Sequence, residues 1–196
     1  MVVYSQTYGL IYGLRTNDID FAVVNTARKV DGTPLPDLLG HLGYEALTDY
    51  QSGIEKFVQD SFEIEFLMHR RGGAAPPAVD LPAWQVTAQP LPFIDILFLR
   101  PVTVHVEDFS LRIPSPEALM VHKLIIARRR TGRGRKEKKE KDLQQCSALA
   151  TIVRVDEVQA ILQEKRMSKE VRKEIAMSCE ETDLEMNILG LYWPGQ

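Results

Sequence analysis

Residues 18–24 read DIDFAVV and residues 62–67 read FEIEFL, and these two stretches decide the fold. The first alternates acidic and apolar side chains and then becomes wholly apolar, which predicts a strand. The second places Glu63 and Glu65 between aromatic and aliphatic side chains, and it predicts another strand inside the alternating region 57–69. Because side chains alternate across a strand, the two acids of each stretch share one face.

Asp18 and Asp20 are candidate metal ligands. They stand two positions apart, with Ile19 between them on the opposite face. Two like charges this close repel one another unless a cation lies between them. Oxygen ligands at this spacing suit Mg²⁺, which keeps some waters and takes substrate phosphates as further ligands. The alternative interpretation is a pair of exposed acids at a strand end, because this spacing is common.

The second strand supplies a third carboxylate if it neighbours the first. Glu63 or Glu65 would then complete a set of three acids that can hold two metal ions. One ion activates the attacking oxygen, and the other binds a triphosphate and stabilises the departing pyrophosphate. The third acid, near the nucleophile, can also accept its proton.

The chain divides by composition near residue 114. Before that point we expect a helix opened by Thr33-Pro34 and ended by Gly43, an edge strand at 44–49, a Gly/Pro-rich loop at 70–82, and strands at 94–99 and 102–113. After it, Ser115 as N-cap and Pro116 as first helical residue predict a helix over 116–130, and further helices follow at 138–153, 156–165 and 168–189. We therefore predict an α+β fold: a mixed or antiparallel sheet with flanking helices in a domain at 1–114, then a helical bundle at 115–196.

The composition is ordinary for a globular protein, with 44% hydrophobic and 26% charged residues. No apolar run is long enough to span a membrane, so we expect no membrane partner. The start of the chain shows no secretory signal. Cys146 and Cys179 do not suggest a secreted disulfide framework, which favours the reducing cytoplasm. No Cys or His lies at ligand spacing, so zinc is not expected.

A cationic block interrupts this acidic protein. Residues 128–141 hold nine Lys or Arg and two Glu, whereas the whole chain has a net charge of −3. Lys123 and Arg130 project from one helix face, and Lys138 and Lys141 open the next helix. An antiparallel helix pair would aim these four at an anion such as a nucleoside triphosphate. The alternatives are a solvated basic surface and a nucleic-acid-binding module, although the block carries no interleaved aromatic side chains.

Several segments resemble bacterial nucleotidyltransferase-fold proteins, which are distant relatives of DNA polymerase β and of the abortive-infection and minimal nucleotidyltransferases. RTNDIDFA at 15–22 resembles their R-T-x-D-I-D-F-A segment, and IEFL at 64–67 resembles their third-carboxylate strand. AQPLPFIDIL at 88–97, IPSPEALMVHKL at 113–124 and KDLQQC at 141–146 resemble segments of one subfamily, in the same order.

The resemblance implies a function and a set of site residues. It implies that Asp18, Asp20 and Glu65 are the catalytic acids and the ligands of Mg²⁺ or Mn²⁺. It also implies that Lys123 and the pair Lys141-Asp142 belong to the nucleotide site, where Asp142 orients a basic neighbour. His122, beside Lys123, is interpreted as a packed core histidine.

One family feature is missing from the residues that precede Asp18. The family places a Gly-Ser or Gly-Thr pair at the start of a helix, where backbone N–H groups hold the triphosphate. Residues 2–9 resemble the helix that follows this pair, so the pair is expected before Met1. Gly9 and Gly13 are candidate substitutes, although neither is followed by Ser or Thr.

Three functions therefore stand as hypotheses. The first is an enzyme that transfers a nucleoside monophosphate from a nucleoside triphosphate to an acceptor hydroxyl of a protein, RNA or small molecule. A role as a toxin or phage-defence component is an analogy with the wider superfamily. The second is a catalytically impaired protein of the same fold that binds a nucleotide, a partner protein or a second copy. The third is nucleic-acid binding through residues 128–141.

Overall fold

In the computed structural model, the described residues are 2–10, 17–24, 32–70, 72–73, 76–132, 135–182 and 184. The chain divides into two compact units. The sheet unit is Arg15–Asp95, and the helical unit combines Met1–Leu14 with Ile96–Gln196. The composition-based boundary at residue 114 remains a prediction about domains.

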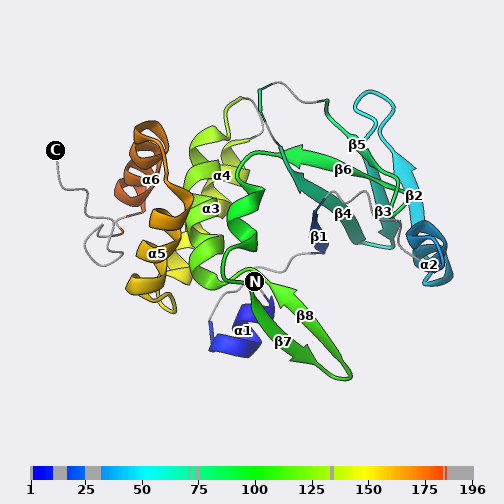
Figure 1. Ribbon diagram of the computed structural model, residues 1–196, viewed down its shortest axis with the longest axis horizontal. Helices are drawn as coiled ribbons and strands as arrows, with labels where there is room; N and C mark the ends of the chain where they lie inside the picture. The colour runs from blue at the N-terminus through cyan, green and yellow to red at the C-terminus, as the bar shows by residue number, and fades with distance from the viewer. Residues whose placement is uncertain are drawn as a thin grey trace. The chain divides into compact units, whose positions relative to one another are not determined.

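The sheet unit is built on a six-stranded mixed sheet (Figure 1). Its strands are β1 (Asp18–Val23), β2 (Glu45–Thr48), β3 (Glu55–Gln59), β4 (Phe62–His69), β5 (Val79–Leu81) and β6 (Val86–Leu91). The order is β2-β3-β4-β6-β5, and β1 pairs with β4. Strands β1 and β6 run parallel to β4, whereas the other pairings are antiparallel. The predicted α+β class and mixed sheet are confirmed, as is the edge strand at 44–49.

One face of β4 builds the core of the sheet unit. Ile64 and Phe66 are buried and pack with Phe57 and with Leu39 of α2 (Leu35–His41). Phe21 of β1 stacks on Phe66 with ring centroids 5.8 Å apart. The alternation of the sequence therefore leaves the acids of β1 and β4 on the opposite face.

A tight turn fixes the register between β3 and β4. Asp60 and Ser61 connect the paired residues Gln59 and Phe62, and Asp60 adopts a left-handed φ of 52°. Asp tolerates this conformation better than most residues, and two-residue hairpin loops need it. The turn therefore decides which side chains of β3 lie beside the acids of β4.

Three expected elements differ in the structure. The strand expected at 94–99 is a 3-10 helix, η1 (Ile94–Phe98), because short apolar runs do not distinguish a strand from a buried helical turn. The single strand expected at 102–113 is a hairpin of β7 (Val102–Val106) and β8 (Phe109–Ile113). The expected loop at 70–82 ends in β5, which pairs with the unforeseen strand β6.

The helical unit packs around α3 (Pro116–Arg129). This helix contacts α4 (Lys136–Leu149), α5 (Val155–Lys165) and α6 (Lys169–Glu181), as Figure 1 shows. The unit also contains α1 (Val2–Tyr8), whose Tyr4 hydroxyl donates to the carbonyl oxygen of Pro114 at 2.6 Å. The predicted helical bundle is confirmed. The last predicted helix ends earlier, at Glu181, and residues 185–189 lie outside the described part of the chain.

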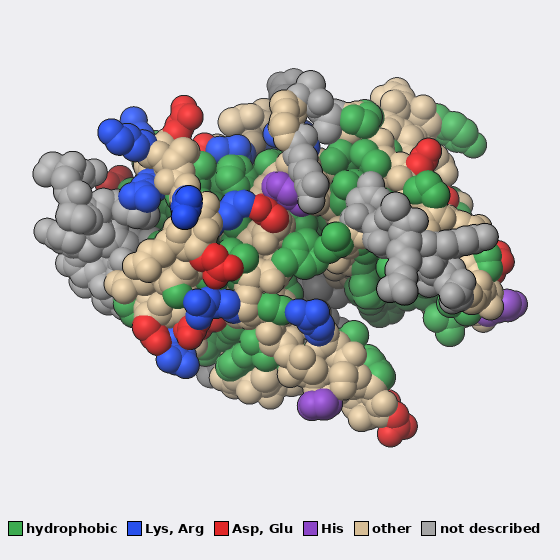
Figure 2. Space-filling model, in the orientation of Figure 1, with side chains coloured by type: hydrophobic (Ala, Val, Ile, Leu, Met, Phe, Trp, Pro, Cys, Tyr) green, Lys and Arg blue, Asp and Glu red, His purple; other side chains and the backbone are tan. Residues whose placement is uncertain are grey.

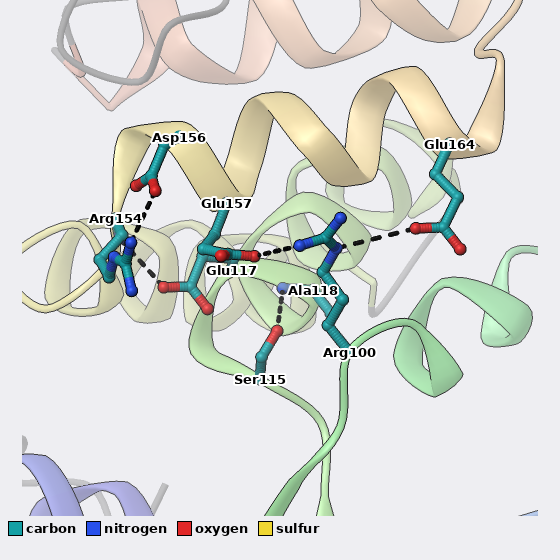
Figure 3. Close-up of polar contacts among 8 residues, drawn as sticks. All are labelled: Arg100, Ser115, Glu117, Ala118, Arg154, Asp156, Glu157 and Glu164. Carbon is teal, nitrogen blue, oxygen red and sulfur yellow. Dashed lines mark hydrogen bonds and ion pairs between the residues drawn. The ribbon is translucent and has the colours of Figure 1, made fainter.

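The predicted start of α3 is confirmed in detail (Figure 3). The Ser115 hydroxyl accepts a hydrogen bond from the Ala118 N–H at 3.2 Å, which is an N-cap. The buried Glu117 carboxylate accepts one from the N–H of Arg154, the residue that precedes α5, at 3.0 Å. This contact joins the start of α3 to the start of α5.

The segment that follows η1 also contacts α5. Arg100 forms ion pairs with Glu157 at 2.7 Å and with Glu164 at 3.7 Å, which lie in the first and third turns of α5 (Figure 3). Within the described residues, none of the helices has the length and apolar character that crossing a membrane requires.

Candidate functional site

Four carboxylates lie side by side on the exposed face of β1 and β4. The parallel register places Asp18 beside Glu63 and Asp20 beside Glu65. Directly paired residues project from the same face of a sheet. Asp18 and Asp20 are exposed, and Glu63 and Glu65 are partly buried. The predicted adjacency of the two strands is confirmed.

Lys56 of β3 lies among these acids, which the sequence analysis did not anticipate. Its ammonium nitrogen is 2.8 Å from Glu63 Oε2 and 2.6 Å from Glu65 Oε1. The hydrogen bond to Glu63, and then the one to Glu65, raise the pKa of Lys56 above its ordinary value. The two-residue turn at 60–61 was the available signal, because it pairs Lys56 with Glu65.

The acids suit a hard divalent cation by their chemistry. They offer carboxylate oxygens on adjacent strands, which is the donor set that Mg²⁺ and Mn²⁺ prefer. Across the parts of the chain that the structure describes, no three His, Cys, Asp or Glu side chains are spaced to hold one metal ion. Glu65 is instead held by Lys56 at 2.6 Å.

The exposed face continues on both sides of this cluster. Toward the edge strand it is hollowed, with a volume of about 380 Å³ and a lining of Gly43, Glu45, Leu47, Val58, Gln59 and Asp60. Val58 pairs with Glu63 and therefore shares its face. At the far end of β4, His69 Nδ1 lies 3.2 Å from Asp95 Oδ1.

In the helical unit, a buried acid gathers two of the predicted cations. One oxygen of Asp142 is 3.0 Å from Lys123 Nζ, and the other is 3.0 Å from Arg130 Nε. The Asp142 side chain is only 6% exposed, compared with 16% for Lys123 and 33% for Arg130. The helix pair is therefore joined by a charge cluster in which Asp142 orients both cations.

Other members of the basic block bind α6. Arg128 and Lys139 both contact Glu181, at 2.7 and 2.6 Å, and Arg129 contacts Glu174 at 3.0 Å. These pairs attach α6 to the helices α3 and α4. Lys138 and Lys141 are exposed near the start of α4. Figure 2 shows Lys and Arg side chains gathered over the helical unit on the face in view.

His122 is buried in α3, as the sequence analysis proposed. It is 7% exposed, and its Nε2 has no hydrogen-bond partner within the described residues. Burial, and then the charge of Lys123, lower the pKa of His122 to about 4, against an opposing effect of Asp142. The imidazole is therefore neutral at physiological pH.

Comparison with known protein families adds the deciding observation. Residues 1–170 match a family of nucleotidyltransferases, and this range includes every site residue that the sequence predicted. The chain belongs to this nucleotidyltransferase family. No protein of curated function matches its sequence. Among solved structures, it is similar to an antigenic nucleotidyltransferase-like protein from Paracoccidioides brasiliensis, with 15% identity, a TM-score of 0.47, and coverage of 90% of this chain and 76% of that one.

The nucleotidyltransferase thus carries its predicted site residues in two groups. Asp18, Asp20 and Glu65 come together in the sheet unit. In the helical unit, contacts join Lys123 and Arg130 to Asp142. Lys138 and Lys141 lie on α4, the helix that carries Asp142. Among the remaining motif positions, Gly13, Arg15 and Thr16 lie outside the described residues. Trp84 packs against the core of the sheet unit.

Proposed function

We propose that this nucleotidyltransferase transfers a nucleoside monophosphate from a metal-bound nucleoside triphosphate to an acceptor hydroxyl. The observation that carries the proposal is the register of β1 and β4, which sets Asp18-Glu63 and Asp20-Glu65 side by side on an exposed face. Carboxylates crowded in this way repel one another and are stabilised by a cation. The family membership supports nucleotidyl transfer as the general activity.

Asp18, Asp20 and Glu65 are the residues we propose as metal ligands and catalytic acids. Mg²⁺ or Mn²⁺ bound there would neutralise charge on the reacting phosphate and on the departing pyrophosphate. Glu65 would also accept the proton of the attacking hydroxyl. The oxygen of the acceptor would form a bond to the α-phosphorus while the bond to pyrophosphate breaks, so one phosphodiester replaces one anhydride.

The cations of α3 and α4 are the residues we propose for the triphosphate: Lys123, Arg130, Lys138 and Lys141, with Asp142 orienting the first two. The start of α4 supports this role. Arg135, Lys136 and Lys138 cluster where the helix dipole disfavours positive charge. A bound anion would remove this conflict, because helix N-termini and ammonium groups both attract phosphate. Arg128 and Arg129 are instead assigned to the contacts with α6.

One observation favours the alternative of nucleotide binding without transfer. Glu65, the proposed third ligand, already holds an ammonium group at 2.6 Å. A protein in which Lys56 replaced the metal permanently would bind a nucleotide without turning it over. Four further features are proposals as well: the acceptor class, a toxin or phage-defence role, binding of a partner protein or second copy, and a cytoplasmic location.

The test is incubation with each α-³²P-labelled nucleoside triphosphate and Mg²⁺ or Mn²⁺, with total protein and total RNA as acceptors. We expect label to reach one acceptor class in a metal-dependent reaction that Asp18→Ala abolishes. Asp37→Ala, which removes an exposed acid from α2, is the matched control and should leave transfer unchanged. Transfer that survives Asp18→Ala would refute the assigned site. Metal-dependent nucleotide binding without any transfer would establish the alternative.

A further inference from the structure

The acid-rich face contains its own cation. Lys56 projects from β3 on the same face as Glu63 and Glu65, because it pairs directly with Glu65. Its ammonium group contacts both carboxylates, at 2.8 and 2.6 Å, and its side chain remains 40% exposed. Among the described residues, the acids of β1 and β4 thus share their face with the ammonium group of Lys56.

The two contacts differ in what they mean for the proposed metal site. Glu65 is the acid we assign to the metal, and the Lys56 ammonium group lies against one of its oxygens. A divalent ion at that oxygen would lie within a few ångströms of a positive charge. Glu63, one residue pair earlier, offers Lys56 a second acceptor that is already in contact.

We propose that Lys56 is a displaceable internal counter-ion, which a divalent metal must move from Glu65 and which Glu63 then retains. This proposal rests on the proposed function, because it assumes that Asp18, Asp20 and Glu65 bind the metal. It assigns different roles to the two acids of β4. Glu65 is the ligand, and Glu63 is a positioning residue that receives the ammonium group. Lys56 is likewise a positioning residue, which holds both acids in place while no metal is bound.

The proposal predicts an increase in metal affinity, which damage to the fold would not produce. Removing the ammonium group should tighten metal binding, whereas a merely structural lysine would weaken binding when lost. Charge repulsion between a divalent ion and a monovalent ion about 5 Å apart, even in water, changes affinity on the order of tenfold.

The experiment measures Mn²⁺ binding to the full chain by electron paramagnetic resonance, without nucleotide. We expect Lys56→Met to bind Mn²⁺ about tenfold more tightly than the wild type, and the charge-conserving Lys56→Arg to bind within about threefold of it. Glu63→Gln should weaken binding, and adding Glu63→Gln to Lys56→Met should change little, because Glu63 acts through Lys56. If Lys56→Met does not fold, Lys56→Gln replaces it.

The outcomes separate the two proposals. Asp18-dependent Mn²⁺ binding in the wild type that is no tighter in a folded Lys56→Met overturns the counter-ion role and leaves the metal site standing. Equal weakening by Glu63→Gln with and without Lys56 also overturns it. If neither the wild type nor the Lys56 variants bind Mn²⁺, the proposed metal site fails and this inference fails with it. Binding that appears only after Lys56 is replaced would show that the metal cannot displace Lys56, which overturns displacement and supports permanent replacement of the metal by the ammonium group.

Discussion

The two charged regions of this protein are organised in opposite ways. In the sheet unit, acids of like charge crowd an exposed face, and Lys56 compensates two of them. In the helical unit, opposite charges meet around the buried Asp142. Buried charges must be paired, because an isolated charge loses its hydration on burial. Acids crowded on one face repel one another, and a bound cation would offset this repulsion, so the sheet face is the stronger indication of a ligand.

The largest effect that this comparison predicts is on stability. Asp142→Asn should lower the free energy of unfolding by about 2–4 kcal/mol, because it leaves Lys123 and Arg130 facing each other without their shared acid. Urea denaturation monitored by circular dichroism measures this change. Glu181→Gln is the control: it removes an acid that also contacts two cations but is 40% exposed, and it should cost less than about 1 kcal/mol. Equal effects would show that burial does not distinguish these clusters.

The second prediction concerns nucleotide affinity. Lys123→Met should weaken binding of the nucleoside triphosphate about 10- to 100-fold, because a charge-assisted contact to phosphate contributes about 1.5–3 kcal/mol. Arg129→Met removes the same charge from the same helix, but this residue pairs with Glu174, so affinity should change less than about threefold. Isothermal titration of the folded variants measures both affinities.

The contrast between these two variants is the informative quantity. Similar small losses that vanish in high salt would show that the basic block acts as a diffuse field. In that case, the cations of α3 and α4 would not hold the triphosphate at the positions proposed here, and the nucleotide site would have to lie elsewhere.

The sequence predicted the sheet face better than the helical cluster, for a physical reason. Alternation places Asp18 and Asp20 on one face with no knowledge of the fold, and an adjacent strand completes the set. Helix periodicity likewise gave Lys123 and Arg130 a common face. It could not show that α6 supplies Glu174 and Glu181, because contacts between distant helices depend on packing.

Short elements failed for a different reason. The apolar run at 94–99 carries no period long enough to distinguish a strand from the 3-10 helix that forms. No element was predicted at 86–91, yet β6 forms there and pairs with β4 and β5; Pro90 within it is unusual for an internal strand. Lys56 was missed although its partners were identified, because the turn at 60–61 was not used to set the register.

The third prediction concerns how stability depends on pH through the buried His122 of the helical unit. Because the pKa of His122 is about 4 in the folded protein and 6.5 is its ordinary value, the unfolded chain binds the proton more readily. Its contribution to stability is complete above pH 6.5 and is lost as the pH falls toward 4. At pH 5 the loss is roughly 2 kcal/mol.

The measurement is the free energy of unfolding of the wild type and of His122→Asn between pH 7.5 and 4.5. The variant is expected to lose less stability on acidification, whatever its stability at neutral pH. Lys123, Arg130 and Asp142 also face this histidine electrostatically, so the difference between the two pH profiles is the relevant quantity. Parallel profiles would show that His122 is accessible to protons in the folded protein.

The last prediction combines the smallest expected effect on stability with the complete loss of metal-dependent nucleotide binding. It is the sharpest test of the comparison between the two charged regions. Asp18→Asn and Asp20→Asn each remove one charge from an exposed, acid-rich face while conserving size. We expect each to change the free energy of unfolding by less than about 1 kcal/mol, because exposed substitutions rarely do more. The melting temperature should stay the same or rise, since crowded acids repel one another. Metal-dependent nucleotide binding, measured on the same samples, should be lost in both variants. Asp142→Asn should do the reverse and cause a large loss of stability. If Asp18→Asn and Asp20→Asn unfold the protein instead, the acids of the sheet face are structural, and the difference between the two regions is not one between a ligand site and a packing site.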